Sequence, residues 1–138
     1  MYKTILVTLE VTPTDRAIIE HIKQLAKVTQ GSVVLLHVAT GVPAQWLGPD
    51  AGGEEVEGDR AYLTQVKAEF EAAGVPARAE LAYGDPVKEI VKWVLDRGCD
   101  LVAMSTHGHQ GLGDLIHGTV ASKVQHNISV PVLLLRAK

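Results

Sequence analysis

The stretch GDPVKEIVKWVLDRGCDLVAMS, residues 84–105, predicts one helix followed directly by one buried strand. Asp85-Pro86 opens the helix, because proline fits the first helical turn, and Gly98 is suited to end it. The apolar residues that share the inner helix face are Val87, Ile90, Val91 and Val94. Asp100–Ser105 then has the apolar character of a strand buried on both faces. Together they predict a helix that packs against a parallel sheet.

The same alternation extends along the whole chain. Further strands are expected at Thr4–Leu9, Ser32–Val38, Ala77–Tyr83 and Val130–Arg136. The first helix is expected to start within Thr12-Pro13-Thr14-Asp15 and to end at Gly31. The second has Tyr62, Val66, Phe70 and Ala73 on one face, and the last covers about Thr119–Ile128. The order predicts one doubly wound α/β domain over residues 1–138, with helices on both faces of a parallel sheet.

Composition excludes several classes of protein. The formal net charge of −3 argues against a nucleic-acid partner, since such proteins usually carry a basic face. Cys99 is the one cysteine, so no internal disulfide can form, which fits a reducing cytoplasmic setting. It is expected to be a small buried residue rather than a nucleophile. No signal peptide is evident and no apolar run reaches about 18 residues, so no membrane association is expected.

Two isolated features have a structural and a functional interpretation. Residues 39–56 are rich in glycine and proline and predict a long loop, and loops of this length are often functional. Trp46 within it covers either core or a ligand, and core is the favoured interpretation. His37, inside the second strand, is expected to be a packed polar residue rather than a ligand.

A ligand is expected beyond the carboxyl ends of the strands, where the strand order reverses. Two connections there are unusual: Thr8–Thr12, and the glycine-bearing stretch STHGHQGLGDLIHGTVASKV, residues 105–124. If the first and fourth strands are neighbours, both connections flank one crevice. Glu10 is the acidic residue expected in it. No nucleophile and base are apparent as a pair, so no catalytic residue is predicted.

The glycine-bearing stretch has three interpretations. The first is a phosphate site, in which Gly118-Thr119 starts the last helix and offers amide donors. The second is a metal site of His107, His109 and His117, and the third is a simple turn. The histidine spacing matches no established metal pattern, so no protein metal ligand is predicted. Neither GxxxxGK[ST] nor a complete GxGxxG is present. The phosphate and turn interpretations remain open on the residues alone.

The spacing resembles the nucleotide-binding signature of the universal stress protein family, which is Gly-x-x-Gly, nine residues, then Gly-Ser/Thr. Ser105 stands at the first glycine position, Gly108 at the second, and Gly118-Thr119 completes the pattern. The stretches YKTILVTLE, VVLLHV, GDPVKEIVKWVLDRGCDLVAMSTHG and SVPVLLLR also resemble segments of that family, so the likeness covers the whole chain.

The resemblance implies a five-stranded sheet of order 3-2-1-4-5 and membership of the branch that binds ATP, with Mg²⁺ held through the phosphates. It places Thr8, Leu9 and Glu10 by the adenosine and Val38 at the adenine. Met104, Ser105 and Thr106 would lie beneath the nucleotide. The residues implied around the phosphates are Gly108, His109, Gly118, Thr119 and Val120.

It also implies a homodimer through the last strand, which would cover an exposed apolar sheet edge. The implied interface residues are Val130, Val132, Leu133, Leu134 and Leu135. Two departures bear on affinity: Glu10 stands where aspartate is usual, and Ser105 where glycine is. The function expected is ATP binding in a regulatory or stress-response role with little or no catalysis. The alternatives are a slow ATP hydrolase or phosphoryl carrier, and a nucleotide-free dimeric interaction module.

Overall fold

The computed structural model describes residues 1–40, 54–107 and 112–137, and for residues 54–55, 107 and 112–119 it describes the backbone alone. The strands are β1 (Thr4–Thr8), β2 (Ser32–Ala39), β3 (Ala77–Tyr83), β4 (Leu101–His107) and β5 (Val132–Ala137). The helices are α1 (Asp15–Thr29), α3 (Glu54–Ala72), α4 (Pro86–Arg97) and α5 (Leu112–Asn127). No helix in the described ranges is long and apolar enough to cross a bilayer.

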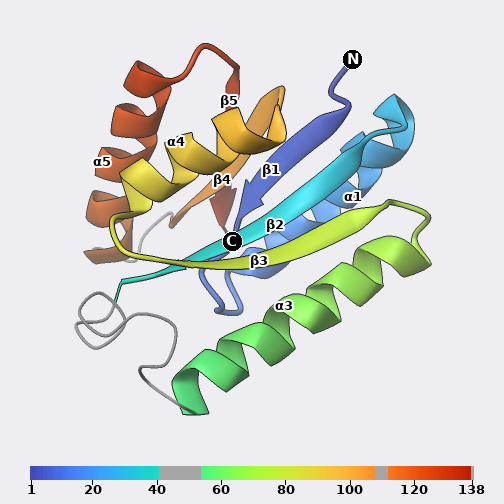
Figure 1. The fold of residues 1–138 in the computed structure, drawn as a ribbon, viewed down its shortest axis with the longest axis horizontal. Coiled ribbons are helices and arrows are strands. Elements are labelled where there is room, and N and C mark those ends of the chain that lie inside the picture. The colour runs from blue at the N-terminus through green and yellow to red at the C-terminus, as the bar shows by residue number, and fades with distance from the viewer. Residues whose placement is uncertain (41–53, 108–111, 138) are drawn as a thin grey trace.

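The strands form one parallel sheet in the order β3-β2-β1-β4-β5 (Figure 1). This confirms the doubly wound α/β class and the 3-2-1-4-5 order. It also confirms that β1 and β4 are neighbours: Ile5 pairs with Leu101 and Val7 with Ala103. The chain leaves β1 toward one side of the sheet and β4 toward the other, so the strand order reverses between them.

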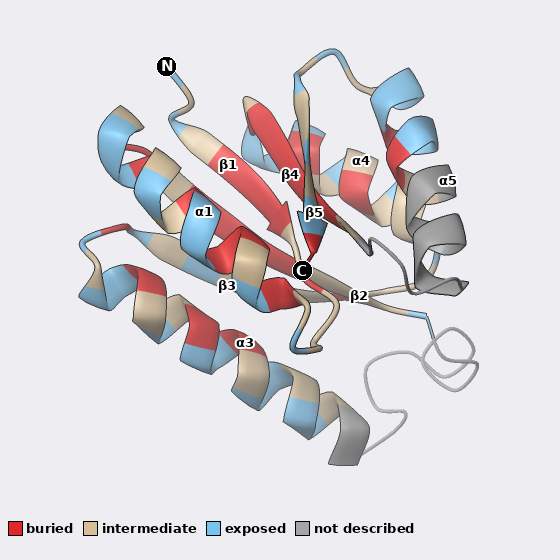
Figure 2. Cartoon of the chain, turned by 180° about the vertical axis from the view of Figure 1, so that it is seen from behind, coloured by how far each residue is buried: buried red, intermediate tan, exposed pale blue. Residues whose placement is uncertain are grey.

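Each face of the sheet has its own apolar core. Figure 2 shows β1 and β4 buried along most of their length between the two helix layers. On one face α1 and α3 supply Ile18, Ile22 and Phe70; we call this the α1–α3 face. On the other, α4 and α5 supply Ile90 and Val124; this is the α4–α5 face. Because strand side chains alternate, odd-numbered β1 residues serve the first face and Leu6 the second.

The ends of the helices follow the sequence closely in α4 and less closely in α1. The Asp85 side chain accepts a hydrogen bond from the Lys88 amide at 2.9 Å, and Gly98 ends α4 in a left-handed conformation with φ of 61°. At the end of α1, however, Gln30 takes the left-handed conformation that was expected of Gly31. Gly31 is required for space, because a Cβ there would overlap the Tyr2 carbonyl oxygen.

The prediction for the last helix was wrong at its beginning. The sequence placed the start at about Thr119, whereas α5 begins at Leu112 and carries Gly118 and Thr119 inside it. The glycines misled the interpretation: glycine costs about 1 kcal/mol in a helix relative to alanine but does not forbid one. The backbone N–H groups of Gly118 and Thr119 therefore belong to the helical hydrogen-bond ladder and are not helix-start donors.

Cys99 is buried in the α4–α5 core, and burial, reinforced by the Asp100 carboxylate, raises the pKa of its thiol from 9.0 to about 11. At pH 8 the reactive thiolate is therefore about a hundredfold rarer than in the unfolded chain. We expect iodoacetamide to alkylate native Cys99 at least a hundredfold more slowly than the urea-unfolded chain, with the native rate rising as pH approaches 11. Mass spectrometry of timed samples measures both rates, and equal rates would contradict the buried assignment.

Candidate functional site

The carboxyl ends of β1 and β4 lie side by side, so the connections that follow these two strands leave the sheet at the same edge. Beyond the pair Val7–Ala103, the next residues are Thr8 on β1 and Met104 on β4. The Leu9 amide continues the ladder by donating to the Leu36 carbonyl oxygen of β2 at 2.8 Å. Thr8 and Leu9 of the first connection and Ser105 and Thr106 before the second therefore lie at one edge of the sheet.

Three of the predicted site residues share the α4–α5 face. Met104 is buried in that core, and Val38 and Val120 pack against it. Strand alternation places Thr8 and Thr106 on the same face, because Leu6 and Met104 belong to it. These residues come from β1, β2, β4 and α5, so the structure brings together segments that lie far apart in the sequence.

Leu9 and Ser105 lie on the opposite face. Leu9 is buried in the α1–α3 core with Ala103, and alternation along β4 points Ser105 the same way. Ser105 is 5% exposed, and its hydroxyl has no hydrogen-bond partner among the residues whose side chains are described. The serine that replaces the expected glycine therefore adds no bulk on the α4–α5 face.

The connection after β1 is organised by Asp15, the first residue of α1, which is fully buried. Its Oδ1 accepts a hydrogen bond from the Glu10 amide at 3.0 Å, and its Oδ2 accepts from the Val11 amide at 2.9 Å. A longer contact of 3.4 Å joins the Thr12 amide to the same Oδ2. From the sequence, Glu10 was the acidic residue expected here, and Asp15 was expected only at the start of the first helix. Its larger role is to hold three successive amides of the loop.

Val11 has a backbone conformation that β-branched residues rarely adopt, with φ of 63°. Left-handed backbone costs a residue with a side chain about 1–2 kcal/mol. Here the conformation turns the Val11 amide toward Asp15 Oδ2, so the hydrogen bond offsets the strain. The shape of the loop thus depends on the carboxylate that it surrounds.

Tyr62 of α3 adds a contact from a second helix. Its hydroxyl donates to Asp15 Oδ2 at 2.8 Å and lies 3.4 Å from the Thr12 carbonyl oxygen. Burial, followed by the hydrogen bond to the Asp15 carboxylate, raises the pKa of Tyr62 above its ordinary value, so the phenol stays protonated and remains a donor. The helical spacing predicted Tyr62 as a core residue; that its hydroxyl would meet Asp15 could be read only from the packing of α3 on α1.

His37 on β2 also contacts this loop. Its Nδ1 lies 2.7 Å from the Leu9 carbonyl oxygen, and its Nε2 lies 3.6 Å from Asp59 Oδ2 of α3. His37 is therefore the packed polar residue that the sequence predicted. Together Asp59 and Tyr62 give α3 two points of contact with the segment Leu9–Thr12, one through His37 and one through Asp15.

Part of the predicted site falls outside the described residues. Gly108, His109 and Trp46 lie there. Gly118 is described by its backbone alone, and the side chains of Thr119, His107 and His117 are not described. Among the side chains that are described, no group of three or more histidine, cysteine, aspartate or glutamate residues is arranged to hold a metal ion. The part of the predicted site that the structure describes in full is therefore the part formed by β1, β2 and β4.

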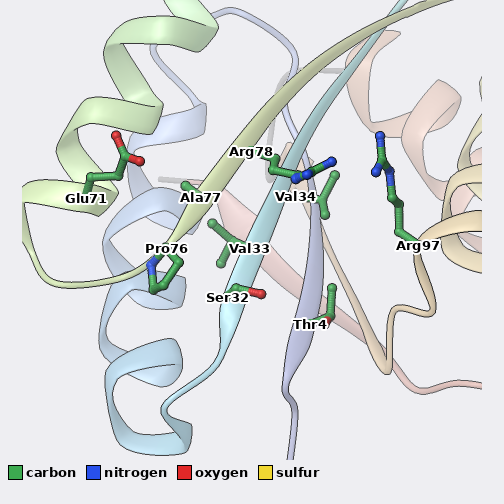
Figure 3. Close-up of a pocket in the computed structure, with 9 residues that line it drawn as sticks. All are labelled: Thr4, Ser32, Val33, Val34, Glu71, Pro76, Ala77, Arg78 and Arg97. Atoms are coloured by element: carbon green, nitrogen blue, oxygen red, sulfur yellow. The ribbon is translucent and has the colours of Figure 1, made fainter.

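A cavity of about 470 Å³ lies elsewhere (Figure 3). Its lining includes Thr4, Ser32 and Ala77, the first residues of β1, β2 and β3, so it lies at the amino ends of these strands, away from the crevice. Arg97 at its rim lies 3.7 Å from Glu80 and stacks over the Trp93 ring at 5.0 Å. Ligands in open α/β sheets bind at the carboxyl ends, so this cavity is not the candidate site.

The comparisons with known proteins agree with this architecture. The sequence pattern of the universal stress protein family matches residues 1–136. The universal stress protein MJ0577 of Methanocaldococcus jannaschii is 26% identical over 157 residues, which cover 100% of this chain and 97% of the relative. The solved structure of MJ0577 superposes with a TM-score of 0.83 at 27% identity and covers 100% of this chain and 98% of that one.

Two further solved structures share the fold at lower identity. A universal stress protein in complex with cAMP has a TM-score of 0.78 at 17% identity, and the match covers 99% of both chains. A universal stress protein of Archaeoglobus fulgidus in complex with dAMP has a TM-score of 0.72 at 15% identity, and the match covers 96% of this chain and 97% of that one.

Proposed function

Because the chain belongs to the universal stress protein family, we propose that it binds an adenine nucleotide, ATP with Mg²⁺, in the crevice between the β1–α1 and β4–α5 connections. The observation that carries the proposal is the spacing Gly108, nine residues, Gly118-Thr119, directly after β4 at the reversal of strand order. Nucleotide complexes of two proteins with this fold, with cAMP and with dAMP, support it.

We assign the two halves of the nucleotide to different parts of the site. Thr8, Leu9, Glu10 and Val38 hold the adenosine, and Met104, Ser105 and Thr106 lie beneath it. Leu9 and Ser105 would take part through their backbone, since their side chains lie on the α1–α3 face. Gly108, His109, Gly118, Thr119 and Val120 surround the phosphates. Since α5 begins at Leu112, the role of Gly118 is to let a phosphate approach the helix closely, and Thr119 offers its hydroxyl.

The role proposed is regulatory, in a stress response, with little or no turnover. A hydrolase needs a base close to the reacting phosphate. Asp15, beside the β1–α1 connection, is fully buried, and its oxygens accept hydrogen bonds from loop amides and from Tyr62, so they are not free to contact an attacking water. We place the protein in the cytoplasm, because its lone cysteine is buried and suits a reducing compartment.

Thr119→Val tests the nucleotide site. Losing a hydroxyl that bonds a charged phosphate is expected to weaken ATP-Mg²⁺ about tenfold and to leave adenosine binding unchanged. Isothermal titration calorimetry measures both, and ATP should also raise the thermal midpoint of the wild type. Thr64→Val on the exposed side of α3 is the matched control. A wild type without heat or thermal shift would favour the nucleotide-free interaction module instead.

We further propose that two copies pair through β5, the edge strand beside β4. Leu134 is 50% exposed there. The other apolar residues of the proposed interface, half-buried in the single chain, are Val130, Val132, Leu133 and Leu135. An exposed apolar edge strand is prone to aggregate unless another chain covers it, so pairing removes a hazard.

A further inference from the structure

The loop Leu9–Thr12 has the backbone form that often binds an anion, but this chain fills it from within. Successive amides that converge on one point make a concavity for phosphate or another anion. Here the Glu10, Val11 and Thr12 amides converge on the Asp15 carboxylate, at 2.9–3.4 Å from its nearer oxygens. The loop amides that could bind an anion are therefore already occupied by a carboxylate of the same chain.

Two side chains of α3, Tyr62 and Asp59, hold this loop in place. The Tyr62 hydroxyl donates to Asp15 Oδ2 at 2.8 Å, and His37 joins the Leu9 carbonyl oxygen to Asp59. α3 is itself fixed: Val66 and Phe70 are buried against the sheet, and Arg16 of α1 bonds both carboxylate oxygens of Glu69 at 2.6 and 3.1 Å. These contacts fix α3, and with it Tyr62 and Asp59, relative to α1 and the sheet.

We infer that Asp15 and Tyr62 are positioning residues that reserve the β1–α1 loop for the adenosine end of the nucleotide and exclude its phosphates. The inference rests on the proposed function and deepens it. Because the Asp15 carboxylate occupies the loop amides, these donors are not available to the phosphates, which are left to the β4–α5 side. Tyr62 holds the carboxylate, and with it the loop, in the shape that receives the adenosine.

Tyr62→Phe is the variant that tests this, because it removes the hydroxyl and keeps the ring that packs on the core. We expect adenosine, AMP and ATP-Mg²⁺ each to bind five- to tenfold more weakly, by the same factor for all three. Calorimetry at 15 °C gives the three ratios, once circular dichroism has established that both proteins are folded at that temperature. Tyr83→Phe on β3 is the matched control, since the Tyr83 hydroxyl contacts Arg60 and not the loop.

Amide hydrogen exchange supplies a readout that needs no nucleotide. Glu10 and Val11 are expected to exchange about tenfold faster in Tyr62→Phe, while Leu6 and Val7 of β1 keep the wild-type rate. A loss of affinity confined to ATP, or no loss with any ligand, would overturn the positioning role. A wild type that binds none of the three ligands overturns the proposed function itself. Unchanged exchange at Glu10 and Val11 in Tyr62→Phe overturns, separately, the claim that Tyr62 holds the loop.

Discussion

Asp15→Ala is expected to lower the free energy of unfolding by about 3 kcal/mol. The substitution leaves the Glu10 and Val11 amides and the Tyr62 hydroxyl without their acceptor, in a place where the carboxylate is fully buried. Each unsatisfied buried group costs about 1–3 kcal/mol, and water entering the gap recovers part of the sum. Without the carboxylate, Val11 can also leave its strained left-handed conformation, which recovers part of the lost stability.

Urea unfolding at 25 °C, followed by circular dichroism, measures this loss. Asp96→Ala on the exposed surface of α4 is the control and should change stability by less than about 0.5 kcal/mol. Asp15→Asn should fall between the two, since an amide has one acceptor oxygen where the carboxylate has two. A loss below about 1 kcal/mol for Asp15→Ala would contradict the view that the carboxylate organises the loop.

Leu134→Lys is expected to turn the proposed dimer into a monomer at about 10 μM, because a buried unpaired ammonium opposes association strongly. The substitution should leave the single chain folded, since Leu134 is half exposed there. Size-exclusion chromatography with light scattering reports the mass of each species.

Leu95→Lys controls for the added charge: Leu95 is 71% exposed on α4, away from the β5 edge. That variant should keep the wild-type mass. A wild type that is already monomeric at this concentration would contradict the dimer. A Leu134→Lys protein that stays dimeric would place the interface elsewhere.

Where local chemistry decides a structure, the sequence predicts it well. Pro86 and Gly98 mark the ends of α4 because one has a fixed φ and the other tolerates a positive one, and both bounds are confirmed. The spacing of Val66 and Phe70 predicted α3, but that helix begins at Glu54, so the end of the stretch 39–56 was wrongly predicted as loop. The strand Ala77–Tyr83 has the bounds expected. These features depend on residues close together in the chain.

The rest depends on contacts between distant segments. Asp15 and Tyr62 are 47 residues apart, and only the packing of α3 beside α1 brings the carboxylate and the hydroxyl together. The start of α5 was misjudged for a related reason, since glycine content is a weaker determinant than the continuity of the helix that runs through it. The side of the strand to which Ser105 points follows from the two cores, which no single stretch reveals.

The two outer strands of the sheet differ, and the difference bears on how large an assembly can grow. β3 and β5 are the outer strands of the sheet (Figure 1). β5 carries three consecutive leucines and one charged residue, Arg136, whereas β3 carries two charged residues, Arg78 and Glu80. Pairing of β5 with β5 closes by a two-fold axis, while pairing of β5 with β3 would leave a new edge and continue into a filament. The charges on β3 disfavour the second arrangement, so the proposed pairing through β5 would stop at two copies.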